Sequence, residues 1–144
     1  MKKLVSLLLM ALAVPVAAQD VSLPNINDAI EPQQSAGGEY RLMVEPGLSP
    51  MRLNTLHYWK LRLTDAKGRA VDGASINVDG GMPGHGHGLP TVPRVIAGDE
   101  PGLYLLRGLR FNMGGAWELK LKIDDGERND QVHLQFMVTD TTGS

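Results

Sequence analysis

From Glu39 onward, apolar and polar side chains alternate along the chain with a period of two. The clearest segments are 57–64, 117–123 and 132–139, in which large apolar side chains occupy every second position. Shorter segments of the same kind occur at 40–45, 74–78, 91–97 and 102–107, and Gly, Pro and Asp residues separate them. A period of two is typical of half-buried β-strands, because successive side chains point to opposite faces. The pattern therefore predicts about seven strands and no helix.

Seven short strands that each have one apolar face favour an all-β fold, a two-sheet β-sandwich. Residues 19–38 have little periodicity and contain Pro24, Pro32 and two consecutive glycines. We therefore expect 19–38 to be an N-terminal arm, either partly ordered or, as the favoured interpretation, a disordered linker, and 39–140 to be the sandwich domain.

The first 18 residues have the features of a secretory signal peptide. Lys2 and Lys3 provide a basic start, 4–14 is an almost unbroken apolar run, and 16–18 reads Val-Ala-Ala. This pattern predicts cleavage after Ala18 and a periplasmic protein that begins at Gln19. No second long apolar segment follows, so we expect no membrane anchor in the mature chain.

Charge and cysteine content exclude several classes of function. Two of the 14 basic residues lie in the predicted signal, which leaves 12 basic against 16 acidic residues and a formal net charge of −4. A dedicated nucleic-acid-binding domain would show a basic excess, so no nucleic-acid partner is expected. The chain has no cysteine, which excludes thiolate catalysis, thiolate metal sites and disulfides.

The segment 81–88, GMPGHGHG, contains two of the four histidines and is too rich in glycine for a regular strand or helix. We interpret it as a loop at one end of the sandwich, where its imidazoles and thioether could reach a common point. Thioether and imidazole ligands together suit copper, particularly Cu(I), better than zinc or calcium. A second glycine-rich turn contains another methionine. The candidate metal ligands are Met82, His85, His87 and Met113.

Two other functions compete with metal binding. The same sandwich could be a metal-free interaction module that docks a partner protein through its glycine-rich loop. An enzyme is disfavoured, because no Ser-His-acid arrangement and no paired carboxylates in a cleft are evident. We therefore expect a binding protein, with a periplasmic or membrane protein as the partner that gives or receives the metal.

Three segments together resemble the YtkA-like domain family, which is related to the FixH-like proteins. Segment 81–90 has a Met-Pro-x-His-x-His loop, 102–104 leads into a Tyr strand, and 111–117 has a Phe-x-Met-x-Gly-x-Trp hairpin. The resemblance covers roughly 39–139 and implies an exported or membrane-tethered immunoglobulin-like sandwich, with copper handling and oxidase assembly among the associations of some relatives. The resemblance implies that the four candidate ligands occupy the ligand positions of the family pattern. It also implies that Tyr104 and Trp117 either stabilise the fold or line the site.

The chain departs from the family pattern in two respects. We expect no anchor in the predicted mature chain, which puts an oxidase-assembly role in doubt. It also has Gly114 where many relatives carry proline. Neither departure affects a candidate ligand.

Overall fold

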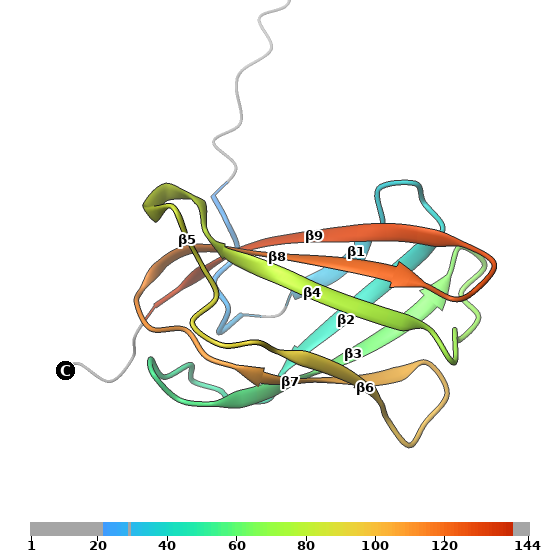
Figure 1. Ribbon diagram of the computed structural model, residues 1–144, viewed down its shortest axis with the longest axis horizontal. Helices are drawn as coiled ribbons and strands as arrows, with labels where there is room; N and C mark the ends of the chain where they lie inside the picture. Colours follow the sequence, from blue (N-terminus) through green and yellow to red (C-terminus); the bar gives the residue numbers. More distant parts are fainter. Residues whose placement is uncertain (1–21, 29, 140–144) are drawn as a thin grey trace, which may run out of the picture.

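Two antiparallel sheets pack face to face in the computed structural model, which describes residues 22–28 and 30–139 (Figure 1). The five-stranded sheet has the order β1 (Ile30–Gln34), β2 (Tyr40–Pro46), β3 (His57–Asp65), β7 (Leu103–Leu109), β6 (Arg94–Ala97). The four-stranded sheet has the order β5 (His87–Gly88), β4 (Ser75–Met82), β8 (Gly115–Asp124), β9 (Asn129–Val138). The predicted all-β sandwich is confirmed. Each of the seven expected segments contains a strand, and β1 and β5 are additional.

The alternation in the sequence corresponds to the inward and outward faces of the strands. Trp59 and Leu61 on β3 are completely buried, whereas Tyr58 and Lys60 between them are exposed. The long hairpin of β8 and β9 places Leu121 opposite Val132 and holds ten residue pairs in register. Apolar residues from both sheets thus form a single core.

The N-terminal arm is not a linker as predicted, because most of it belongs to the sandwich. Strand β1 pairs with β2, and Asn25 forms a parallel bridge with Met137 at the end of β9. Ile26 and Ile30 are both buried in the core. The sequence pattern missed β1 because this strand has five residues and its register shifts between Ile30 and Gln33, so no alternation develops. The domain therefore begins before Glu39.

The antiparallel order brings several strand ends together at one end of the sandwich (Figure 1). Strands β4, β7 and β9 end there, and β3 and β8 begin there. Among the described residues, no helix is long and apolar enough to cross a membrane. The predicted signal peptide and cleavage site lie outside the described residues.

Candidate metal site

The segment 81–88 is a short β-hairpin rather than an irregular loop. Strands β4 and β5 pair Gly81 with Gly88 and Met82 with His87, and a single 3-10 turn, η1 (Pro83–His85), joins them. Gly86 closes the turn with φ 68°, and its N–H donates to the carbonyl oxygen of Met82 at 3.0 Å. A Cβ atom at Gly81 would collide with the carbonyl oxygen of His87. Glycine here therefore allows the two strands to approach closely.

The hairpin exposes both histidines at its tip and holds their rings near each other. The ring centroids of His85 and His87 are 5.9 Å apart, and both residues are exposed. Nδ1 of His87 lies 3.1 Å from the carbonyl oxygen of Gly88. In this contact Nδ1 carries the proton, so the lone pair of the neutral ring is on Nε2, the nitrogen available to a metal.

Three observations place the second glycine-rich turn beside this hairpin. The ring of Trp117 packs edge-on against His87, with centroids 6.0 Å apart. The indole N–H of Trp117 donates to the carbonyl oxygen of Met113 at 3.0 Å. A Cβ atom at Gly115 would lie 2.9 Å from the terminal methyl carbon of Met82. Trp117 thus links the two turns, and the absence of a side chain at Gly115 makes room for the end of Met82.

The four candidate ligands differ widely in burial. Met82 is 1% exposed and belongs to the core, and Met113 is half-buried against the same core. His85 and His87 are exposed above them. In the described part of the chain, no three His, Cys, Asp or Glu side chains come together as a metal-binding group. A site with three or more protein ligands at this hairpin would therefore have to use methionine sulfur.

Sequence reasoning missed a carboxylate next to the hairpin. Glu118 and His87 both line a small hollow of about 130 Å³. Glu118 forms an ion pair of 2.8 Å with Lys120 and a hydrogen bond of 2.8 Å with His133, and these hydrogen bonds, that of Lys120 foremost, lower the pKa of Glu118. The feature of the sequence that could have identified Glu118 is its outward position on the strand, directly after Trp117. Because both carboxylate oxygens already have partners, Glu118 is not an available ligand in this arrangement.

Tyr104 stabilises the fold and does not line the candidate site. Its hydroxyl donates to the carbonyl oxygen of Val71 at 2.7 Å and accepts the N–H of Ala74 at 3.0 Å. These partners precede β4, whereas Met82 is the last residue of that strand. Trp117, by contrast, contacts the hairpin directly.

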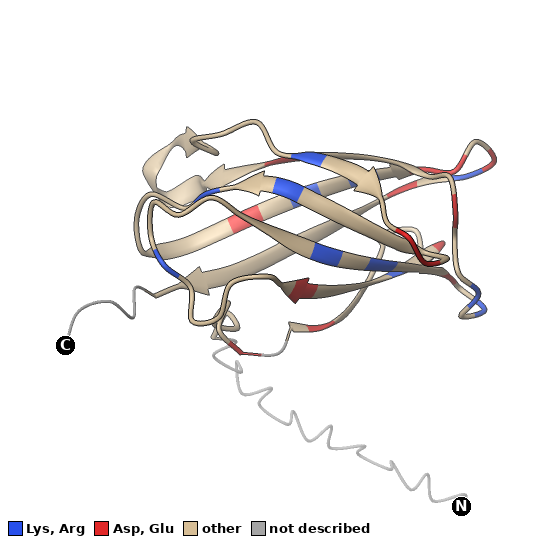
Figure 2. Cartoon of the chain, turned by 90° about the horizontal axis from the view of Figure 1, so that it is seen from below, with Lys and Arg blue, Asp and Glu red and all other residues tan. Residues whose placement is uncertain are grey.

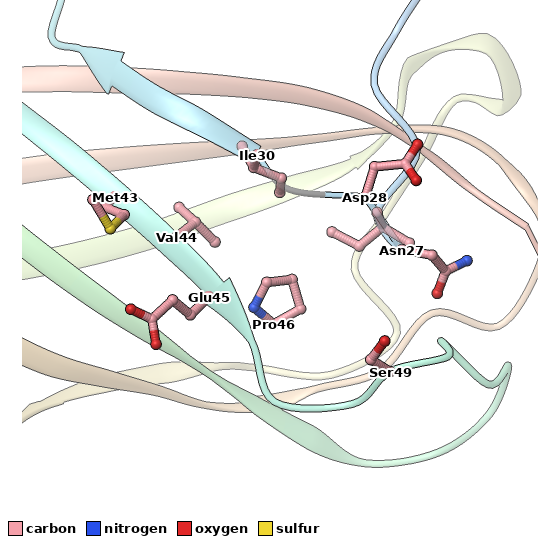
Figure 3. Close-up of a pocket in the computed structure, with 9 residues that line it drawn as sticks. Asn27, Asp28, Ile30, Met43, Val44, Glu45, Pro46 and Ser49 are labelled. Atoms are coloured by element: carbon pink, nitrogen blue, oxygen red, sulfur yellow. The ribbon is translucent and has the colours of Figure 1, made fainter.

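A larger hollow of about 360 Å³ lies at the edge of the five-stranded sheet, between the segment before β1 and the end of β2 (Figure 3). Figure 3 shows its two acidic residues, Asp28 and Glu45, well apart on different sides of the hollow. The lining contains no imidazole, and it adds nothing to the candidate metal site.

Comparison with known proteins gives one family. Residues 32–122 match the model of the family described as YtkA-like. No curated protein matches the chain. A solved structure, the ZirS C-terminal domain, is similar with 11% sequence identity and a TM-score of 0.44, and the match covers 92% of this chain and 87% of that one. That likeness is too distant to carry an argument. Because the matched family segment spans more than half of the 144 residues, the chain belongs to the YtkA-like family.

Proposed function

We propose that this protein is an exported, periplasmic copper carrier or buffer that binds one ion through Met82, His85, His87 and Met113. The observation that carries the proposal is the packing of the two glycine-rich turns against each other through Trp117. Had the turns lain at opposite ends of the sandwich, their methionines and histidines could not share an ion.

The donor set determines which metal is proposed. Two thioethers and two neutral imidazoles form a soft site, which favours Cu(I) over harder ions. Zinc sites usually have three or more nitrogen, thiolate or carboxylate ligands, and only two imidazoles are available here. Calcium and magnesium require several oxygen ligands, which the hairpin does not supply.

The distribution of burial suits exchange rather than permanent storage. The imidazoles at the hairpin tip are open to solvent and to a partner protein, whereas the thioether of Met82 is in the core below. A metal held partly by exposed rings can be passed to another protein by stepwise replacement of ligands. We propose a periplasmic or membrane protein as the partner, and no catalytic activity for the chain itself.

A competition titration against a chromogenic Cu(I) chelator tests the imidazole part of the site. We expect the double substitution His85→Ala and His87→Ala to abolish Cu(II) binding and to weaken Cu(I) binding. The matched control is His133→Gln, because His133 is an exposed histidine on β9 outside the hairpin and a glutamine amide can still donate to Glu118. The control should bind copper as the wild type does.

The thioether part of the site is tested with Met113→Leu in the same titration. We expect a selective loss of Cu(I) affinity, because sulfur contributes more to the softer ion. Met43→Leu is the control, since Met43 is an exposed methionine on β2. If the double histidine variant holds Cu(I) as tightly as the wild type, the hairpin is not the site. A metal-free interaction module would then be the better interpretation.

A further inference from the structure

The outer face of strands β2, β3, β7 and β6 has an excess of basic side chains although the chain as a whole is acidic. Outward positions on β2, β3, β7 and β6 carry five cations and one acid, namely Arg41, Lys60, Arg62, Arg94, Arg107 and Glu45. Only Arg62 among these cations forms ion pairs in the described structure, with Glu45 and Glu100. Figure 2 shows basic positions along the strands and many acidic positions in the turns at one end.

Two of these cations lie directly opposite each other on neighbouring strands, and no acidic side chain of the described structure forms an ion pair with either. Arg94 on β6 and Arg107 on β7 are direct cross-strand partners, and neither has an ion-pair partner among the described residues. Like charges directly opposite each other in a sheet destabilise it. An external anion placed over the pair would relieve this repulsion. Tyr58, the partner of Arg107 on its other side, extends the row with an exposed aromatic ring.

The exposed large apolar side chains belong to the same part of the molecule as the five-stranded sheet. All those found in the described residues belong to this sheet or to the loops that enter it: Met43, Leu56, Tyr58, Val92 and Ile96. Val92 and Leu56 are the most exposed, at 85% and 65%. Leu56 directly precedes His57, and His57 pairs with Leu109 at the end of β7. Val92 directly precedes Pro93, and the Cα of Pro93 would lie 3.8 Å from a Cβ atom at Gly108 of β7. Leu56 and Val92 therefore flank the end of β7.

We propose that this face, defined by Arg94, Arg107, Tyr58, Leu56 and Val92, docks on an anionic phospholipid bilayer. At a bilayer surface, arginines meet lipid phosphates while Tyr and aliphatic side chains enter the interfacial layer. The apolar side chains alternate with cations across the strands instead of forming one patch, which fits such a surface. The core of a protein interface is depleted of charge, and a second copy of this face would bring arginines against arginines.

Vesicle flotation of the processed protein, beginning at Gln19, tests the proposal. We expect binding at low ionic strength to vesicles of equal parts phosphatidylglycerol and phosphatidylcholine, and none to phosphatidylcholine alone. Raising the salt should weaken the binding, because the attraction is electrostatic. Because the chain as a whole is negatively charged, its binding to anionic vesicles would have to come from a local basic surface.

Charge-matched variants locate the surface. Arg94→Gln with Arg107→Gln should weaken binding about thirtyfold, the effect of two cations near an anionic surface. The control, Lys67→Gln with Lys122→Gln, makes the same change of net charge in the turn after β3 and on the other sheet, and should bind almost as the wild type does. Leu56→Ser with Val92→Ser should weaken binding by about tenfold or more.

Folding does not confound this comparison, because removing the opposed arginines relieves repulsion and should leave the unfolding midpoint unchanged or raised. Absence of vesicle binding, equal binding to both vesicle types, or equal losses in the two charge variants would overturn the proposal. If poly-glutamate binds to this face and vesicles do not, the partner is an acidic protein and the lipid proposal is wrong.

Discussion

His57 illustrates how packing fixes the state of a single side chain. Its ring lies in an aromatic cluster, with centroids 5.5 Å from Phe111 and 6.4 Å from Trp59. Nδ1 donates to the carbonyl oxygen of Thr55 at 3.0 Å, so Nε2 is the nitrogen that would take up a proton. Nε2 is buried and has no hydrogen-bond partner in the described structure. Protonation there would bury an unpaired charge, and burial accordingly lowers the pKa of His57.

This depressed pKa leads to a prediction about stability and pH. In the unfolded chain His57 takes up a proton near the ordinary value of about 6.5, whereas in the folded chain it resists protonation. Stability should therefore fall as the pH decreases below about 6.5. Urea titrations between about pH 8 and pH 5 should show a smaller fall for His57→Phe, which keeps a ring but cannot titrate. An equal pH dependence in wild type and variant would contradict the assignment.

At the residue scale, the sequence identified the types of candidate ligands but not their burial. The two histidines next to glycines are exposed. Nothing in the local sequence shows that Met82 is part of the core, since this depends on the packing of Gly115 against it. The hydrogen bond between Glu118 and His133 was also not predicted, because it joins two strands whose register is set by the whole hairpin.

At the element scale, strand β8 allows a direct test of the register. Leu121 is completely buried and lies opposite Val132, whereas Lys122 is exposed and lies opposite Gln131. We expect Leu121→Ala to lower the free energy of unfolding by about 2–5 kcal/mol, through the cavity that it leaves. Lys122→Ala should change it by no more than about 0.5 kcal/mol.

Lys122 is a better control than its neighbour Lys120, which forms an ion pair with Glu118. The measurement is a denaturant titration followed by fluorescence, since Trp59 and Trp117 are both buried. Similar losses for Leu121→Ala and Lys122→Ala would mean that the inward and outward faces of β8 are wrongly assigned.

The long strands were predictable because each has four or five inward positions, enough to establish a period of two. Strands β1 and β5 were not, for different physical reasons. In β1 a register shift and Pro32 interrupt the alternation. Strand β5 has two residues, and it forms because glycine at 81 allows close pairing with β4. Local propensity opposes a strand there, and tertiary packing decides the outcome.

At the scale of the whole molecule, the segment before β1 pairs with the last residues of the edge strand β9. The N–H of Ile26 donates to the carbonyl oxygen of Met137, and the N–H of Met137 donates to that of Pro24, both at 2.8 Å. The side chain of Ile26 is 2% exposed. Contacts between residues more than 100 positions apart cannot be read from a local pattern, which is why the sequence suggested a linker at this place.

The contribution of this segment to the fold can be measured with two substitutions inside the predicted arm. Ile26→Ala should lower the free energy of unfolding by about 2–5 kcal/mol, because it empties a buried position that joins the arm to both sheets. Glu31→Ala, at an exposed position of β1, should change it by no more than about 0.5 kcal/mol. Urea titrations monitored by fluorescence and by circular dichroism should give one common transition for each variant, since arm and sheets share one core. If Ile26→Ala were as mild as Glu31→Ala, the arm would be dispensable, and the domain would begin near Glu39 after all.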